Sequence, residues 1–285
     1  MGSYLRPTSL PEALEALGAG LDEGRPRVIV AGATDHFPAR VGRVADEDVL
    51  DVSALADLRG IRAIDGGWWI PALATWADVI DGNLPPLLDG LRLAAGAVGG
   101  RQIQNRGTVV GNLVNASPAA DGTPNLLVLD AVVTVASRRG ERRIPVRRFV
   151  TGNRSTVRAA DELVTGLFIP AATGGPTARS TFLKLGSRAY LVISIAMVAA
   201  LLVVDDARRI VEARVAVGAC SPVAQRLAAL EGVLAGRAAE PGIGTAVLPD
   251  HLMGLTPIDD VRGSAAYRLD AAMTLVRRAL EGLVA

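Results

Sequence analysis

Two stretches of the sequence combine glycine with short polar side chains, as phosphate-binding loops do. The first is VIVAGATDHFP at 28–38, where a run of β-branched residues ends at Gly32 and Thr34 and Asp35 follow. A chain that turns after a buried strand leaves backbone N–H groups exposed, and a nest of such groups suits a phosphate or diphosphate. Strands followed by a glycine turn are common, so this loop alone is also consistent with an ordinary turn.

The second stretch is RGTVVGNLVNASPAADGTPNLL at 106–127. It places a hydroxyl at Thr108, a carboxamide at Asn112 and a carboxylate at Asp121 in a mostly apolar chain. A turn-rich surface loop that only reverses the chain would have a similar composition. Two such turns on neighbouring strands could hold both sides of one diphosphate, so the pair is more specific than either stretch alone.

Other nucleotide-binding and catalytic motifs do not fit. GAGLDEG at 18–24 is one residue too long in its last gap for a dinucleotide fingerprint, and it closes a helix instead of opening one. The sequence has no P-loop lysine motif, no G-x-S-x-G and no H-E-x-x-H. Trp68, Trp69 and Trp76 are expected to anchor the core or a subunit interface rather than to stack on a cofactor.

Composition narrows the class of protein further. The chain has 285 residues, is 50% hydrophobic and 21% charged, and carries a formal net charge of +1. These values are typical of a folded globular protein and give no sign of nucleic-acid binding. The single Cys220, with only His36 and His251 as histidines, excludes an internal disulfide and argues against a metal site. The basic run at 138–148 is interpreted as the solvated tip of a hairpin in preference to a docking patch.

Targeting signals also are not evident. Residues 1–17 have no basic stretch followed by an apolar one, and the apolar run at 189–204 is shorter than the ~20 residues of a membrane span. We therefore expect a cytoplasmic protein with no membrane span.

Local patterns predict the elements that would position the two loops. Ser9 followed by Glu12 is a capping-box pattern that opens a helix. Further elements are predicted from apolar runs and from Gly and Pro punctuation. They are strands at 27–32, 49–55, 126–137, 140–150 and 161–170, and helices at 11–21 and 87–98.

A second unit follows a linker predicted at 171–180. We expect a strand at 181–188 and a long hairpin over 193–219. Ser221 as a cap and Pro222 at the first helical position predict a helix over 221–236. A last amphipathic helix is expected at about 264–283. The pattern indicates an α+β protein with about 170 residues in the first part and about 110 in the second.

With these residues in view, the sequence resembles the FAD-binding (medium) subunit of molybdenum hydroxylases, the family of xanthine dehydrogenase and aerobic carbon monoxide dehydrogenase. The resemblance runs nearly from end to end, and its motifs occur in the family's order. They are the opening Tyr4–Ala13, the loop Ala31–Asp35, IQNRGTVVGN at 103–112, ASPAAD at 116–121, ELVTGLFIP at 162–170, F-x-K-x-x-x-R at 182–188 and the turn Gly218–Arg226.

The resemblance implies the fold. It predicts an α+β chain with a vanillyl-alcohol-oxidase-type FAD-binding domain at 1–172, in two α/β lobes of about 1–56 and 57–172. A C-terminal flavoprotein domain of the carbon monoxide dehydrogenase type would follow at 176–285, with a three-stranded antiparallel sheet and a helical bundle.

The resemblance also implies FAD as the cofactor and names the residues that would hold it. The first loop would wrap the diphosphate with backbone N–H groups of Ile29, Val30, Ala31, Gly32, Ala33, Thr34, Asp35 and His36. The second lobe would complete this cradle with Thr108, Gly111 and Asn112. Asp121 would bind ribityl or adenosine hydroxyls, the backbone of Val164 would lie near the adenine, and Lys184 would lie near the flavin ring. A cation there could stabilise negative charge on the reduced ring.

Three positions depart from the family pattern. Ala33 and Val110 stand where many relatives have a glycine, and Gln104 replaces the usual arginine. If either of the first two positions needs a positive φ, its Cβ costs roughly 1–2 kcal/mol. In that case the affinity for flavin would be reduced.

The implied function is that of an FAD-carrying electron-transfer subunit in a molybdenum hydroxylase. Molybdopterin would lie on a large partner subunit and two [2Fe–2S] centres on a small one, in a dimer of heterotrimers. The final acceptor would be NAD⁺, a quinone or O₂, and no side chain of this chain would act on the organic substrate. Two alternatives stay open. One is a stand-alone flavin oxidoreductase of the same fold, such as a UDP-N-acetylenolpyruvoylglucosamine reductase. The other is a scaffold subunit that has lost FAD, which Ala33 and Val110 would favour.

Overall fold

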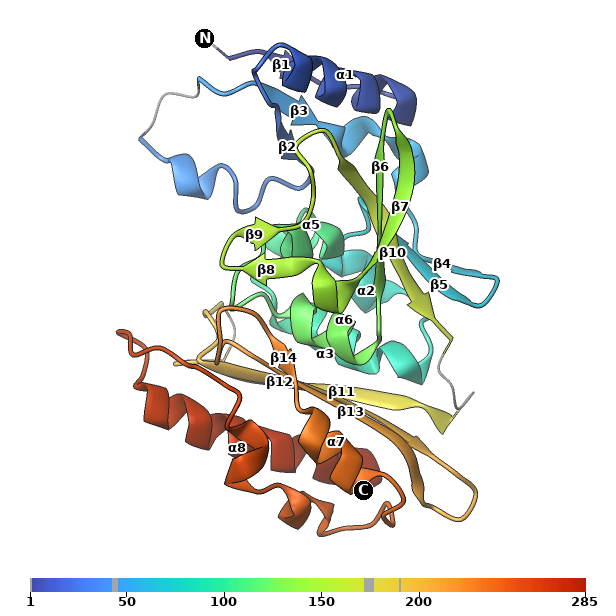
Figure 1. Cartoon of the computed structure of the whole chain (residues 1–285), viewed down its shortest axis with the longest axis vertical. Helices are drawn as coiled ribbons and strands as arrows, with labels where there is room; N and C mark the ends of the chain where they lie inside the picture. The colour runs from blue at the N-terminus through green and yellow to red at the C-terminus, as the bar shows by residue number, and fades with distance from the viewer. Residues whose placement is uncertain (1, 43–45, 172–176, 190) are drawn as a thin grey trace.

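The computed structural model describes residues 2–42, 46–171, 177–189 and 191–285 (Figure 1). Three groups of strands and helices follow one another along the longest axis of the molecule. The N-terminal part lies at one end, a larger mixed part in the middle, and the C-terminal part at the other end. The chain is described below in this order.

The first lobe is a small parallel sheet covered by one helix. Its strands are β1 (Tyr4–Leu5), β2 (Val28–Val30) and β3 (Val49–Asp51), in the order β1-β3-β2. The helix α1 (Leu10–Asp22) begins where predicted, because the Ser9 Oγ accepts a hydrogen bond from the Glu12 N–H at 3.4 Å. Ala13 and Leu17 on its inner face are fully buried. The predicted helix and both predicted strands are thus confirmed in outline.

The second lobe contains a five-stranded antiparallel sheet in the order β4-β5-β10-β6-β7. Its strands are β4 (Arg62–Ile64), β5 (Gly67–Pro71), β6 (Val132–Ser137), β7 (Gly140–Pro145) and β10 (Leu163–Pro170). A separate small hairpin joins β8 (Val150–Gly152) to β9 (Ser155–Thr156). The helices of this lobe are α2 (Trp76–Asp81), α3 (Asp89–Ala97), α4 (Arg101–Gln104), α5 (Val109–Val114) and α6 (Gly122–Val128).

The polar stretch at 106–127 differs from its prediction. It forms the two short helices α5 and α6 with a turn between them, not a long surface loop. The strand predicted over 126–137 is accordingly wrong in its first part, because Leu126–Val128 closes α6 and β6 begins only at Val132. Every residue of α6 is buried, so its apolar run has no helical periodicity, and such a run cannot be told from a buried strand.

The tryptophans lie in or against the core, as predicted, but Trp76 also lines a cavity between the two lobes. Trp76 opens α2 and is 1% exposed within the main hydrophobic cluster, and Trp68 packs partly against that cluster from β5. Trp69 is half-buried on β5, and a Cβ on Gly166 of β10 would lie 2.4 Å from its ring. Gly166 therefore leaves the space that this ring occupies.

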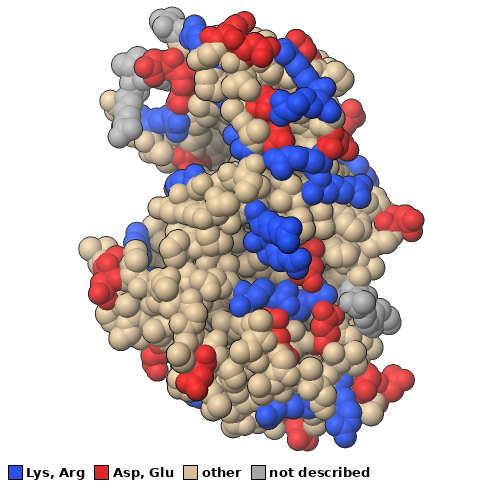
Figure 2. Space-filling view, viewed as in Figure 1, with Lys and Arg blue, Asp and Glu red and all other residues tan. Residues whose placement is uncertain are grey.

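The basic run at 138–148 forms a hairpin that is more than a solvated tip. Ser137 of β6 pairs with Gly140 of β7, which confirms the predicted turn. Arg138 at the turn binds Glu15 and Asp22 of α1, both at 2.7 Å, so the hairpin ties the second lobe to the first. Residues 138–143 are all exposed, so the predicted solvated tip is confirmed, and its Arg138 also makes surface ion pairs to α1. Figure 2 shows basic side chains gathered along this part of the surface.

The C-terminal part is an antiparallel sheet backed by helices. Its long strands are β11 (Arg179–Leu185), β12 (Ala196–Val204) and β13 (Ile210–Gly218), and the short β14 (Gln225–Arg226) extends the expected three strands at one edge. The predicted hairpin over 193–219 is confirmed. So is the last helix, α8 (Ala265–Val284), whose Ser264 Oγ accepts the Tyr267 N–H at 3.2 Å.

The helix predicted over 221–236 starts later than expected. Ser221 does not cap it, because its Oγ donates to the Cys220 carbonyl and accepts the Thr256 N–H at 3.0 Å. The chain then pairs with β13 as β14, and helix α7 occupies only Ala228–Leu234. Half of the predicted linker, residues 172–176, lies outside the described residues, and residues 179 and 180 already belong to β11.

The strand β12 explains the long apolar run at 189–204. Its side chains alternate between two hydrophobic clusters: Met197 and Leu201 join the core of the second lobe, while Val198 and Leu202 pack with α7 and α8. A strand buried on both faces reads as continuously apolar. No helix among the described residues has the length and hydropathy needed to cross a membrane.

Candidate functional site

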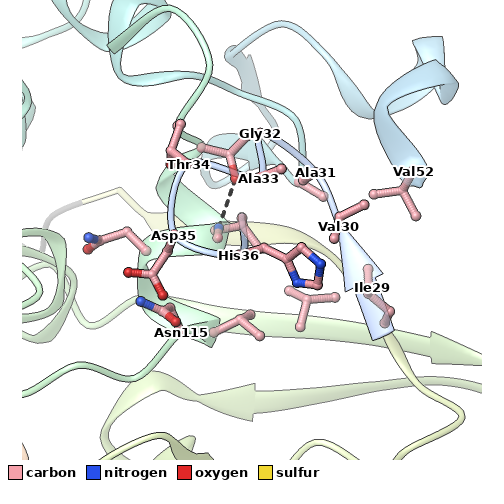
Figure 3. A pocket seen from close by; sticks show the side chains of 18 of the residues that line it. Ile29, Val30, Ala31, Gly32, Ala33, Thr34, Asp35, His36, Val52 and Asn115 are labelled. Atoms are coloured by element: carbon pink, nitrogen blue, oxygen red, sulfur yellow. Dashed lines mark hydrogen bonds between the residues drawn. The ribbon is translucent and has the colours of Figure 1, made fainter. Parts of the chain in front are cut away.

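The two predicted loops line one cavity. It lies between the first and second lobes and has a volume of about 710 Å³, within the ~300–1,000 Å³ range of small-molecule and cofactor sites. Figure 3 shows the residues from Ile29 to His36 curving around it, with Asp35 next to Asn115. The predicted site residues that line it are Ile29, Val30, Ala31, Gly32, Ala33, Thr34, Asp35, His36, Thr108, Gly111, Asn112 and Val164.

The loop that follows β2 presents free backbone donors. Within the described ranges, the backbone N–H groups from Gly32 to His36 have no protein acceptor within hydrogen-bond distance. The loop is held at its end instead, where the Phe37 N–H donates to the Ala33 carbonyl and the Ala39 N–H to the Asp35 carbonyl. Unpaired amides on a cavity wall need an acceptor, and a phosphate oxygen or water can supply it.

The two loops touch each other backbone to backbone. A Cβ on Gly32 would lie 1.8 Å from the Arg106 carbonyl oxygen, and a Cβ on Gly107 would lie 3.3 Å from the Thr34 Oγ1. Only glycine fits at position 32 without moving the second loop. The first and second lobes thus meet at the wall of the cavity.

Ala33 and Val110, which replace glycines of the family pattern, differ in backbone conformation. Ala33 has a φ of 57°, in the left-handed region that favours glycine. Val110 lies inside helix α5, is 4% exposed and has no positive φ. Only Ala33 therefore carries the strain considered from the sequence. Gln104 is buried, and its side-chain amide donates to the Val98 carbonyl at 3.2 Å just after α3.

The second predicted loop, residues 106–112, contains the start of α5, and side-chain hydrogen bonds fix its position. Thr108 caps α5, since its Oγ1 accepts the Gly111 N–H at 2.9 Å. The Asn112 Oδ1 accepts the Gly122 N–H at 3.1 Å and so joins α5 to the start of α6. The Trp76 N–H donates to the Gly107 carbonyl at 3.0 Å. These bonds give the wall formed by the second lobe a defined position before any ligand binds.

The cavity carries an excess of positive charge. Arg27, Arg40 and Arg158 line it, against Asp35 as the one lining carboxylate among the described residues. Arg40 pairs with Glu47, and this ion pair lowers the pKa of Glu47 below its usual range. Such a charge balance favours an anionic ligand.

His36 lines the same cavity. Burial, together with the nearby Arg40 charge, lowers the pKa of His36 below 6.5, so its imidazole is mostly neutral at pH 7. The carboxylate of Glu47 opposes this shift from 3.9 Å away. The imidazole therefore adds a polar group at neutral pH and little charge.

An arginine that does not itself line the cavity binds two residues that do. Arg154, at the turn between β8 and β9, binds the Asp35 carboxylate at 2.8 Å and the side-chain oxygen of Asn115. Asp35 belongs to the loop after β2 and Asn115 to the end of α5. Arg154 thus links both walls. Sequence reasoning missed this residue, because nothing in its local pattern relates it to either loop.

Asp121 and Lys184 lie together, outside the residues that line the cavity. The Lys184 Nζ is 2.6 Å from the Asp121 Oδ2, and the Ser194 Oγ donates to the Asp121 Oδ1 at 2.6 Å. Burial raises the pKa of Asp121, and the Lys184 charge and the Ser194 hydroxyl oppose this. The group joins the start of α6 to β11 of the C-terminal part, a pairing that the sequence did not indicate.

A cavity between a small parallel sheet and a larger mixed lobe, lined by unpaired amides and arginines, suits an anionic ligand such as a dinucleotide. The similarity of the sequence to known protein families agrees with such a ligand. Residues 1–172 match the family described as the FAD binding domain in molybdopterin dehydrogenase, and residues 181–283 match the carbon monoxide dehydrogenase flavoprotein C-terminal domain. The chain belongs to this family of FAD-carrying oxidoreductase subunits.

Individual relatives match along almost the whole chain. The nicotine 6-hydroxylase medium subunit of Paenarthrobacter nicotinovorans is 29% identical, over 97% of this chain and 95% of the relative. The 6-hydroxypseudooxynicotine dehydrogenase complex subunit alpha of the same organism is 30% identical, over 97% and 92%. The crystal structure of quinoline 2-oxidoreductase from Pseudomonas putida 86 has a TM-score of 0.89 at 25% identity, covering 100% of this chain and 97% of that one.

These findings confirm the family, the fold class and FAD as the cofactor. The residues present also fit this group. Unpaired amides and an excess of guanidinium groups suit a diphosphate, and Gly32 leaves room for the two loops to meet. The partly apolar walls, with Trp76, Val98 and Ile103, suit an aromatic ring system.

Proposed function

We propose that this chain is the electron-transferring flavin subunit of a heteromeric molybdenum hydroxylase. It holds FAD between the [2Fe–2S] centres of a small partner subunit and an external acceptor, which is NAD⁺, a quinone or O₂. When bound, FAD supplies the exchange between one-electron and two-electron transfer. The observation that carries the proposal is the single cavity that both lobes build, in a chain whose family match extends over both domains.

The sequence supports the need for partners. One cysteine cannot supply the four thiolates of a [2Fe–2S] cluster, so these 285 residues cannot hold such a centre by themselves, and we place the centres on a partner subunit. Relatives are named as medium subunits or as subunits of complexes. We place molybdopterin on a large subunit and propose a dimer of heterotrimers in the cytoplasm. The organic substrate is then bound by the large subunit, in accord with relatives named for nicotine and for carbon monoxide.

Each proposed site residue has a task in holding FAD. The loop 29–36 grips the diphosphate through the unpaired backbone amides from Gly32 to His36. Thr108, Gly111 and Asn112 form the facing wall, where the N–H groups of Gly111 and Asn112 already donate to Thr108. The backbone of Val164 contacts the adenine, beside a bulge that interrupts β10 between Val164 and Gly166. From the family resemblance alone we keep Asp121 for sugar hydroxyls and Lys184 for the edge of the flavin, although neither lines the cavity and the two side chains pair with each other. We also keep the FAD-binding domain at 1–172 and the C-terminal domain at 176–285.

A visible absorption spectrum tests FAD binding against the alternative of a scaffold that has lost its cofactor. We expect the purified chain, supplied with FAD and then freed of excess by gel filtration, to keep the absorption of bound flavin. A chain that elutes without flavin would favour the scaffold. The helical backbone at Val110 removes one of the two features that supported this alternative, and Ala33 alone remains.

Purification from the native host tests the subunit assignment against a stand-alone flavin oxidoreductase. We expect the chain to elute with an iron–sulfur protein and a molybdenum protein, and its flavin to be reduced when the organic substrate of the complex is added. A flavin-loaded chain that always elutes alone, and that oxidises a substrate unaided, would contradict the assignment.

A further inference from the structure

A cavity-lining arginine has no acidic partner. Arg158 lies between β9 and β10 with its side chain half-buried, and it lines the cavity beside Ala160 and Leu163. Its Nη1 donates to the carbonyl oxygens of Ala159 at 2.9 Å and Glu162 at 2.7 Å. Among residues 2–42, 46–171, 177–189 and 191–285, no carboxylate lies within ion-pair distance of its guanidinium.

The two acidic residues nearest to Arg158 in sequence form ion pairs with other arginines. Asp161 binds Arg139 at 2.5 Å, and Glu162 binds Arg142 at 2.6 Å. Both carboxylates are buried, and these hydrogen bonds lower the pKa of each. Neither can turn to Arg158 without leaving another arginine unpaired. Burial accordingly lowers the pKa of Arg158, and the charges of Glu162 and Asp161 oppose this only in part.

Two of the other charges on the cavity wall are paired with an opposite charge, while Arg27, like Arg158, contacts neutral acceptors alone among the described residues. Arg40 has Glu47 as its counter-ion, and Asp35 is bound by Arg154. Arg27 donates to the Ala16 carbonyl at 2.9 Å and the Ser3 hydroxyl at 3.1 Å. Arg158 is therefore a desolvated cation held in place by neutral acceptors. A half-buried charge without a counter-ion is costly, and the cost falls when an anion binds beside it.

We propose that Arg158 is the counter-ion of the cofactor's diphosphate and fixes the ADP half of FAD in the cavity. This inference rests on the proposed FAD site. The diphosphate is the only charged part of FAD at neutral pH, so it is the group that can pair with this cation. A guanidinium offers a planar fork of donors that matches phosphate oxygens, and a lysine at the same place would match them less well.

Binding of ADP and adenosine to the full-length, flavin-free chain separates the diphosphate from the base. Calorimetric titrations compare the unaltered chain with Arg158→Leu and Arg158→Lys. We expect Arg158→Leu to weaken ADP binding at least about tenfold, as for loss of a charge-assisted hydrogen bond, and to change adenosine binding less than about twofold. Arg158→Lys should fall between, and raising the salt concentration should weaken ADP binding less in Arg158→Leu than in the unaltered chain.

Arg147→Leu is the matched control, because Arg147 is exposed on the 3₁₀ turn Val146–Arg148 and does not line the cavity. It should leave binding of both ligands unchanged. Equal losses of ADP and adenosine in Arg158→Leu would overturn the inference, because the side chain would then contact the base. Unchanged ADP binding would overturn it as well.

Failure of the proposed FAD site and failure of the role of Arg158 give different binding results. An unaltered chain that binds neither ADP nor FAD contradicts the proposed FAD site itself, and with it the inference. An unaltered chain that binds both, beside an Arg158→Leu chain that binds ADP equally well, contradicts only the role of Arg158. Thermal unfolding of the ligand-free variants checks folding, and Arg158→Lys keeps the test valid if Arg158→Leu does not fold.

Discussion

Ala33 holds a left-handed backbone with φ of 57° at the centre of the loop that surrounds the cavity. An L-residue pays roughly 1–2 kcal/mol for this conformation, and glycine does not. Val110, the other residue that replaces a family glycine, sits at helical dihedrals and is buried in the core of the second lobe. The same kind of departure from the family pattern thus has opposite consequences at the two positions.

Glycine substitutions should separate these positions. Ala33→Gly relieves the strain but gains flexibility in the unfolded chain, so we expect the free energy of unfolding to rise by about 0.5–1 kcal/mol. Val110→Gly should lower it by at least about 2 kcal/mol, since it loses a buried side chain and weakens a helix. Urea denaturation of the flavin-free chain measures both. A destabilised Ala33→Gly would show that the left-handed backbone is not strained.

Lys184 and Asp121 form a buried ion pair whose contribution to the free energy of unfolding depends on pH. Lys184→Met leaves Asp121 buried without its cation, and we expect a loss of about 3–5 kcal/mol in unfolding free energy at pH 7. Burial already raises the pKa of Asp121 above 3.8, and loss of Lys184 raises it further. The native state then holds the proton more tightly than the unfolded state, so stability falls as the pH rises through the native pKa.

The destabilisation of Lys184→Met should therefore be smaller at pH 4 than at pH 7. Adding Asp121→Asn to Lys184→Met should restore part of the stability at pH 7, because no carboxylate is left to be desolvated. Chemical denaturation between pH 4 and pH 8 measures both effects. A destabilisation that does not change over this range would mean that Asp121 is not ionised in the native protein.

At the scale of elements, contacts between segments far apart in sequence build the site. The loop after β2 rests on the backbone of residues 106 and 107, and the hairpin of β8 and β9 reaches over both through Arg154. The side chains of Arg154 and Asp35 are 51% and 55% exposed, so their ion pair contributes at most about 1 kcal/mol. That is enough to affect how fast a ligand leaves.

Arg154→Ala should raise the rate at which FAD dissociates by up to about fivefold, because the edge of the cavity loses a link between its two walls. Recovery of flavin fluorescence after dilution of the loaded chain measures this rate. Arg148→Ala, an exposed arginine on the 3₁₀ turn Val146–Arg148, is the control and should leave the rate unchanged. An equal dissociation rate in Arg154→Ala and the unaltered chain would contradict the role of Arg154.

Elements with clear local signals could be predicted from the sequence, and elements set by tertiary contacts could not. Ser9 and Gly140 mark a helix start and a turn where the structure has them. Ser221 carries an equally good local signal, but its hydroxyl is used by Thr256, 35 residues away, and no helix begins there. Helix α6 is buried on every side, so its sequence lacks the helical alternation of apolar and polar residues from which a helix is predicted.

The candidate site was predictable to the same extent. The two glycine-containing stretches could be identified from the sequence, and in the structure both line one cavity. Arg154 could not be found because its partner Asp35 is distant in sequence. Arg158 could not be found because its neighbours Asp161 and Glu162 are bound by the distant Arg139 and Arg142. Asp121 and Lys184 are each visible alone, but their pairing needs the contact between α6 and β11.

At the scale of the whole molecule, the C-terminal sheet joins two hydrophobic clusters. Strand β12 contributes to the core of the second lobe with one face and to the cluster around α7 and α8 with the other. Breaking this sheet would therefore disturb the cofactor domain as well. Lys184 and Ser194 lie at the same junction, where the C-terminal part reaches Asp121.

The central claim is that the diphosphate of one FAD molecule binds between the unpaired amides of residues 32–36 in the first lobe and the wall formed by residues 107–112 of the second lobe. Hydrogen–deuterium exchange of the full chain, with and without saturating FAD, measures this most directly. We predict that FAD slows exchange in both segments, 31–36 and 107–112, and leaves the hairpin tip at 205–209 unchanged. Slower exchange in only one of the two segments, or in neither while FAD is bound, would contradict the claim.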